Sequence, residues 1–114
     1  TFQTVCHFIT EHLHEPLDRQ RVASALNLSP THISRLFAQF SDHSFAGFLR
    51  QQRLTLARDL LGDPAMTVSE IAQRVGFSST NYFVRSFRQA HGMPPGKYRQ
   101  ALDSQPTRPQ PSRP

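Results

Sequence analysis

Two groups of hydrogen-bonding side chains, about fifty residues apart, carry the chemistry that this 114-residue sequence suggests. Each group follows helical spacing and lies on the side opposite the apolar residues of its segment. An arginine fork can pair with guanine and an asparagine amide with adenine, while an aliphatic side chain can meet a thymine methyl group. We therefore predict contacts to DNA bases from Thr31, Ser34, Arg35, Thr80, Asn81, Val84 and Arg85.

A second set of residues is suited to the phosphate backbone. Free N–H groups and hydroxyls at a helix start attract anions, and Lys and Arg add positive charge. The predicted phosphate-contacting residues are Ser29, Ser78, Ser79, Tyr82, Arg50, Arg88, Lys97 and Arg99. Partial core packing is the alternative for Tyr82, and a phosphate contact or a salt bridge is the alternative for Arg35. Arg53 lies at the rim of an apolar face, and we expect a structural ion pair there.

A repeated pattern of short helix, turn and second helix positions both groups. In each copy the first helix ends at a residue that tolerates a left-handed backbone, Asn27 or Gly76. Ser29 and Ser78 are the predicted caps of the second helices. One extra residue in the second copy shifts the offset between the copies from 49 to 50. This layout is typical of a helix-turn-helix, whose second helix enters a DNA major groove.

The remaining periodicity predicts an all-α chain. Asp18 caps the start of one copy, and Thr67 with Glu70 forms a capping box at the start of the other. The wide apolar arc of residues 44–61 indicates a central helix packed by both copies. Besides the short first helix of each copy, five helices are predicted. They are residues 2–14, 30–41, 44–61, 79–91 and a last helix that ends near Leu102.

These elements divide the chain into three parts. Residues 1–62 form a first helix-turn-helix unit that includes the linker helix, and residues 63–103 form a second unit. Residues 104–114 are rich in proline and lack apolar anchors, so we expect a disordered tail. Because Thr1 is not an initiator Met and begins no signal pattern, we expect a further domain upstream.

Charge and composition indicate a polyanionic partner. The net charge is +5, and residues 19–99 hold eleven Lys or Arg against four Asp or Glu. Twelve of the thirteen basic residues are Arg, whose planar fork binds phosphate and guanine. No stretch approaches the roughly 18 apolar residues of a membrane span. One cysteine, Cys6, excludes an internal disulfide, and we expect a soluble cytoplasmic protein in which Cys6 is a small buried residue.

The sequence argues against a metal site, a cofactor and an enzyme. The six histidines include His12 and His14, but neighbours two apart on a helix diverge, and no H-x-x-x-H or cysteine pair is present. No Ser/His/Asp set, glycine-rich phosphate loop or carboxylate dyad has the context that catalysis needs.

The ordered series of motifs resembles the DNA-binding domain of the AraC/XylS family of bacterial transcription regulators. The segments that carry this resemblance are Leu28–Phe37, Arg53–Leu61, Ile71–Ser79, Asn81–Arg88 and Gly92–Arg99. The family implies a seven-helix domain of two helix-turn-helix units joined by a rigid helix, usually C-terminal to an effector-binding or dimerisation domain. Asp42 stands where the family commonly has Gly, so the end of the first recognition helix is expected to differ. Val84 replaces a common small polar residue, which weakens a polar base contact there.

The leading hypothesis is a transcription regulator, in particular an activator, that places two different recognition helices in successive major grooves of double-stranded DNA. One chain would then recognise an asymmetric site. A second hypothesis is a helical module whose basic face docks an acidic protein such as RNA polymerase, and both can hold in an activator. A third is the DNA-targeting part of a recombinase or repair enzyme.

Overall fold

The computed structural model describes residues 2–103, and this part of the chain contains seven α-helices and no strand. The predicted disordered tail, residues 104–114, lies outside the described residues. The all-α prediction and the seven helices implied by the resemblance are confirmed. The helices are α1 (Phe2–Glu11), α2 (Arg19–Leu26), α3 (Pro30–Phe40), α4 (Phe45–Leu60), α5 (Val68–Arg74), α6 (Thr80–His91) and α7 (Pro95–Asp103).

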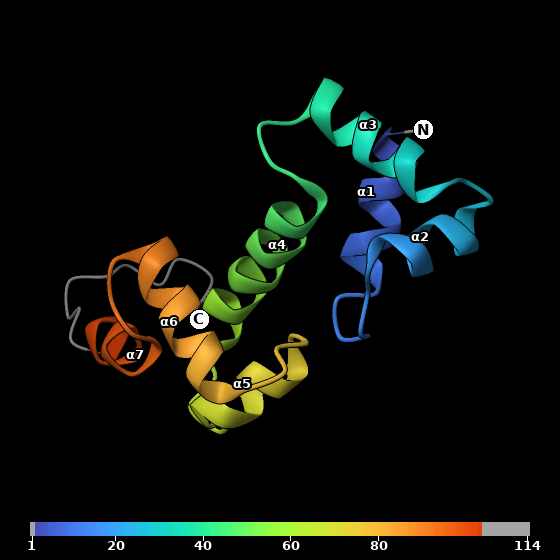
Figure 1. Cartoon of the computed structure of the whole chain (residues 1–114). Coiled ribbons are helices and arrows are strands. Elements are labelled where there is room, and N and C mark those ends of the chain that lie inside the picture. The colour runs from blue at the N-terminus through green and yellow to red at the C-terminus, as the bar shows by residue number, and fades with distance from the viewer. Residues whose placement is uncertain (1, 104–114) are drawn as a thin grey trace, which may run out of the picture.

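Two compact groups of helices lie at opposite ends of α4 (Figure 1). The first unit contains α1, α2 and α3, and the second contains α5, α6 and α7. Helix α4 packs against α1 and α3 on one side and against α5 and α6 on the other. It therefore serves as the last helix of the first unit and as the first helix of the second.

Each unit has its own hydrophobic core, and α4 contributes to both. Phe45 and Leu49, in the N-terminal half of α4, are buried in the first core. Leu54 and Ala57, in its C-terminal half, are buried in the second. Leu56 packs partly against both cores. This arrangement matches the prediction that both copies pack on the central helix.

Local sequence signals explain where most helices begin. Asp18, Ser29 and Ser44 each accept a hydrogen bond from the backbone N–H three residues later, which satisfies a donor that the first turn leaves free. Thr67 and Glu70 form the predicted capping box. In α6 the cap is Ser79, which accepts from the Tyr82 N–H at 3.0 Å, so the prediction of Ser78 was wrong.

The extra residue of the second copy explains this correction. Asn27 directly follows α2, whereas α5 ends at Arg74 with Val75 as its cap, so Gly76 lies one residue beyond that cap. Both residues have a positive φ, as predicted, at 59° and 96°, and they are offset by 49. The caps Ser29 and Ser79 are offset by 50. The turn of the second copy is therefore one residue longer than that of the first, and its additional residue lies between Gly76 and Ser79.

Two helices end in a way that helical periodicity alone does not predict. Helix α1 ends at Glu11 instead of residue 14, although Leu13 remains buried in the first core. Helix α3 ends at an extended residue, Ser41 with φ −142°, whereas α6 ends at left-handed Gly92 with φ 84°. The expected difference at the end of the first recognition helix is thus confirmed, because Asp42 offers no glycine for a left-handed end.

Candidate nucleic-acid interface

The first recognition helix, α3, presents its predicted base-contacting face to solvent. Pro30 at its first position and the Ser29 cap fix its start, and the buried Ile33, Leu36 and Phe37 hold its opposite side in the core. Thr31 and Arg35 are exposed. No hydrogen bond or ion pair given for the described residues occupies the Arg35 guanidinium, which leaves its five donors available.

Ser34 is half-buried and already has a partner within the protein. The Arg19 Nη1 atom donates to the Ser34 Oγ at 2.6 Å, from the first residue of α2. Arg19 was not among the predicted site residues, because no local spacing in the sequence links it to Ser34, fifteen residues later. The structure adds Arg19 to the face that α3 presents, and it shows that a base contact by Ser34 has to share the hydroxyl with this guanidinium.

The second recognition helix, α6, has the same arrangement with different outward residues. Asn81 and Arg85 are exposed, while Phe83 and Phe87 are fully buried in the second core. Thr80 is half-buried and its Oγ1 lies 3.4 Å from the Ser69 Oγ. Val84 is half-buried and packs against the second core, so only part of this side chain is accessible to a thymine methyl group.

Three of the predicted phosphate-contacting residues come together in a groove between the two units. This groove has a volume of about 620 Å³ and is lined by Arg50 from α4, Ser78 from the α5–α6 turn and Tyr82 from α6. Arg19 lines the same groove. The Tyr82 ring packs on Phe77, with centroids 5.5 Å apart, yet its side chain is 41% exposed. Both predicted roles of Tyr82, partial packing and access to a partner, are compatible with this position.

The other predicted phosphate-contacting residues lie elsewhere on the domain. Ser29 and Ser79 are exposed caps at the starts of α3 and α6, where free backbone N–H groups and the positive helix ends meet. Arg88 and Lys97 are exposed on α6 and α7. None of these residues is among those that line the groove between the units.

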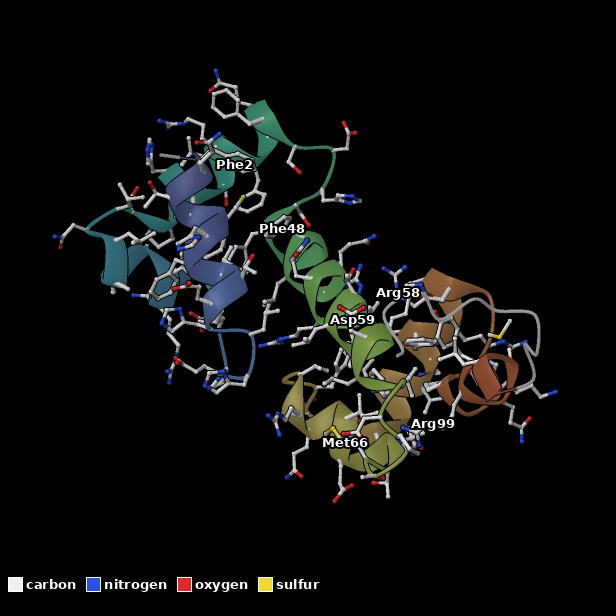
Figure 2. All side chains as sticks on the ribbon, turned by 180° about the vertical axis from the view of Figure 1, so that it is seen from behind. Phe2, Phe48, Arg58, Asp59, Met66 and Arg99 are labelled. Carbon is white, nitrogen blue, oxygen red and sulfur yellow. The ribbon has the colours of Figure 1, made fainter. Side chains whose placement is uncertain are left out.

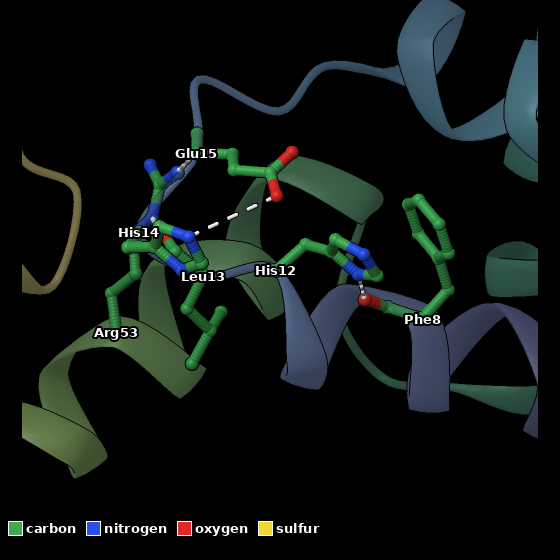
Figure 3. A network of polar contacts seen from close by, with 6 residues as sticks. All are labelled: Phe8, His12, Leu13, His14, Glu15 and Arg53. Atoms are coloured by element: carbon green, nitrogen blue, oxygen red, sulfur yellow. Dashed lines mark hydrogen bonds and ion pairs between the residues drawn. The ribbon is translucent and has the colours of Figure 1, made fainter.

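Arg53 has a structural role, but not the predicted ion pair. Its Nε donates to the Leu13 carbonyl at 3.0 Å, and one of its Nη atoms donates to the Glu15 carbonyl at 2.7 Å (Figure 3). Burial lowers the pKa of the Arg53 guanidinium below its ordinary value. The partners are backbone carbonyls from the connection between α1 and α2, which helical periodicity does not reveal.

Arg99 makes the equivalent pair of bonds in the second unit. Its Nε donates to the Leu61 carbonyl and an Nη atom to the Asp63 carbonyl, both at 3.2 Å. Figure 2 shows Arg99 reaching from α7 to the chain that leaves α4. In both cases an arginine thus binds two carbonyls, two residues apart, that lie just after the end of a helix three elements earlier in the chain. Because these donors are engaged within the protein, we do not expect Arg99 to contact phosphate, unlike the sequence-based prediction.

The remaining candidate features are dispersed. Within residues 2–103 no three His, Cys, Asp or Glu side chains lie close enough to hold a metal ion, and none of the helices there is long and apolar enough to cross a membrane. Cys6 is half-buried against the first core, and this burial raises the pKa of its thiol.

Comparison with known proteins decides the family. The helix-turn-helix domain family matches residues 22–101. The regulator YpdC of Escherichia coli, described as an uncharacterised HTH-type transcriptional regulator, is 36% identical over 97 residues. The chain belongs to the AraC/XylS family. In that family it corresponds to the helix-turn-helix DNA-binding domain of a transcription regulator.

Solved AraC-type domains have the same fold. The DNA-binding domain of AdpA, solved with a target DNA, is 29% identical, with a TM-score of 0.86 over 95% of this chain and 97% of that one. The C-terminal domain of AraT from Geobacillus stearothermophilus is 33% identical, with a TM-score of 0.82 over 88% of this chain and 84% of that one.

The AraC-type relatives are much longer than this chain. The match to YpdC covers 85% of this chain and 34% of the relative. The match to the regulatory protein PocR of Salmonella typhimurium, 36% identical, covers 84% of this chain and 32% of the relative. The chain therefore spans about a third of the length of these curated relatives.

Proposed function

We propose that this AraC-type domain binds one asymmetric DNA site by placing α3 and α6 in two successive major-groove segments. The observation that carries the proposal is the matched exposure of the two recognition helices. Arg35 and Arg85 are both exposed at the same position of α3 and α6, while the opposite faces of these helices close two separate cores. The neighbouring Thr31 and Asn81 are exposed but differ chemically, so the two helices would prefer different bases.

The dimensions of the central helix support this placement. Helix α4 has sixteen residues and is therefore about 24 Å long. Adding the width of the helices at its two ends brings the recognition helices near the roughly 34–36 Å that separates successive major-groove segments on one DNA face. A small remaining mismatch would be absorbed by bending the DNA, at a cost of a few kcal/mol.

The groove between the units is suited to the phosphate backbone that separates two major-groove segments. Arg19 and Arg50 would neutralise phosphates there, and the Ser78 and Tyr82 hydroxyls would donate hydrogen bonds. Ser29, Ser79, Arg88 and Lys97, which are exposed outside this groove, would add further phosphate contacts. These contacts position the domain, and the residues on α3 and α6 supply the base preference.

Selection of bound sequences from a random DNA pool tests this proposal. We expect the wild-type chain to select two short motifs about one helical turn apart. Arg35→Ala should relax the preference within one motif and Arg85→Ala within the other, each at a cost of about 1–3 kcal/mol. The exposed Arg58 and Arg74 lie outside the proposed interface, and R58A and R74A should retain both motifs. Selection of a single motif, or loss of the same base positions in both variants, would contradict the two-segment arrangement.

We further propose that the complete protein activates transcription in the bacterial cytoplasm, with RNA polymerase as a protein partner and an effector-binding or dimerisation domain N-terminal to this one. The length of the relatives supports the additional domain. Transcription in vitro from a promoter that carries the selected site should rise with the complete protein. Repression would indicate a repressor instead of an activator. Polymerase binding by the basic face without any DNA binding would favour a protein-docking module.

A further inference from the structure

The turn of the second helix-turn-helix lies directly against the end of the first helix of the first unit. Gly76 has a φ of +96°, and a Cβ placed on it would lie 2.3 Å from the Leu13 carbonyl oxygen. The same Cβ would lie 2.8 Å from the Arg53 Nε and 2.9 Å from its Cζ. Backbone from both units and one guanidinium from α4 therefore meet at a single point, which we call the Arg53 junction and define as Leu13, Glu15, Arg53 and Gly76.

This junction is a direct contact between the two units, each of which has its own core. On α4 the last buried residue of the first core is Leu49 and the first of the second core is Leu54, and partly buried Leu56 packs against both cores. A single helix can bend, and each unit could follow its own half of α4 without disturbing its own core. The angle between α3 and α6 therefore depends on contacts that join the units away from the α4 axis.

Arg53 is chemically suited to hold this position. Its planar fork donates to two carbonyls at once, which fixes the direction of the guanidinium, and the half-buried site strengthens both hydrogen bonds. The Nε and Cζ atoms of this guanidinium lie directly against Gly76. A glycine is required there because any side chain would meet the Leu13 backbone, which cannot rotate away.

We infer that Arg53 is a positioning residue that sets the orientation of the second recognition helix relative to the first, and thereby the spacing of the two DNA segments that the domain accepts. This inference rests on the proposed two-segment binding. Arg53 also lines the groove between the units. Its Nε and one Nη are bonded to the Leu13 and Glu15 carbonyls, so we expect it to act through these carbonyls and Gly76.

The chain contains a matched control for this role. Arg99 makes the same two-carbonyl contact, but both of its partners, Leu61 and Asp63, belong to the connection from α4 to α5 within the second unit. Arg53→Met and Arg99→Met thus remove the same kind of bond. Only the first of these variants alters the junction between the units.

The first experiment measures DNA affinity as a function of spacing. Starting from the selected site, the distance between the two motifs is changed by one and two base pairs. The wild type and R99M should lose affinity about tenfold or more at each altered spacing, as for a mismatched base pair. R53M should bind the original site more weakly and should show a difference of less than about threefold among spacings. A wild-type spacing profile in R53M, or an equally flat profile in R99M, would overturn the inference.

The second experiment requires no DNA. Residual dipolar couplings report whether α1–α3 and α5–α7 share one orientation in solution. One alignment tensor should fit both units in the wild type and in R99M, whereas R53M should require two. Should the wild type select no two-part site, the proposed function fails, and the couplings still decide whether Arg53 fixes the orientation.

Two glycine variants test the Arg53 junction independently, in case R53M does not fold. Gly76→Ala and Gly92→Ala both place a side chain at a positive φ. Only the Gly76 variant meets the other unit, since a Cβ placed on Gly92 has no neighbour within 4 Å. G76A should lose the common tensor and G92A should keep it. A common tensor in G76A would contradict the Arg53 junction.

Discussion

Two pairs of arginines in this domain differ in their surroundings: one pair is exposed to solvent and the other is hydrogen-bonded within the protein. Arg35 and Arg85 are exposed at matching positions of the recognition helices, with their charge available to a partner. Arg53 and Arg99 instead donate to pairs of backbone carbonyls at the ends of α1 and α4. The same planar fork suits both situations, since two parallel donors match a base edge as well as two carbonyls.

The correction at Ser78 leads to a prediction at the same scale. Ser79→Ala should lower the free energy of unfolding by about 1 kcal/mol, because the Tyr82 N–H loses its acceptor in the first turn of α6. Ser78→Ala should change it by less than about 0.5 kcal/mol, since this exposed residue caps no helix. Urea denaturation of the two variants measures the difference, and equal losses would contradict the assignment of the cap.

The sequence predicts exposed residues better than their hidden partners. Arg35 and Arg85 follow from helical periodicity, because the apolar residues determine which side of a helix remains in solvent. The partners of Arg53 could not be found in this way, since a carbonyl 38 or 40 residues away leaves no mark in local spacing. The repeat did contain a signal: Leu13 and Glu15 precede the first copy as Leu61 and Asp63 precede the second.

At the scale of the elements, α4 belongs to both units. Its N-terminal half completes the core under α1–α3 and its C-terminal half completes the core under α5–α7. Its wide apolar arc revealed this double role in the sequence. The end of α1 was less predictable, because Leu13 remains buried after the helix has ended and so preserves the apolar pattern.

Two leucines of α4 test whether the cores are energetically separate. Leu49→Ala and Leu54→Ala each remove a buried side chain and should destabilise the chain by about 2–5 kcal/mol. Amide hydrogen exchange should accelerate mainly in α2 and α3 for L49A, and mainly in α5 and α6 for L54A, because each cavity lies in one core. Uniform acceleration along the whole chain in both variants would show one cooperative core instead.

For the whole molecule, the proposed function depends on charge distributed across both units and the groove between them. Four exposed cations belong to the proposed backbone contacts: Arg19, Arg50, Arg88 and Lys97. Neutralising about four phosphates predicts a plot of log affinity against log salt concentration with a slope of about −3 to −4. A slope near zero would contradict DNA as the partner and favour docking of a protein.

Substitution of Arg50, one of these four cations, tests whether it contacts phosphate or a base. Arg50 is exposed on α4, which is neither recognition helix, and lines the groove between the units. Arg50→Gln should weaken binding to the selected site and to unrelated DNA by a similar factor, and should make the salt slope shallower by about 1. Arg58→Gln, which removes an exposed arginine from the same helix outside the groove, should leave the slope unchanged. Because both variants reduce the net charge equally, a common loss would indicate only the general field of the domain, and a loss confined to R50Q would indicate a phosphate held in the groove.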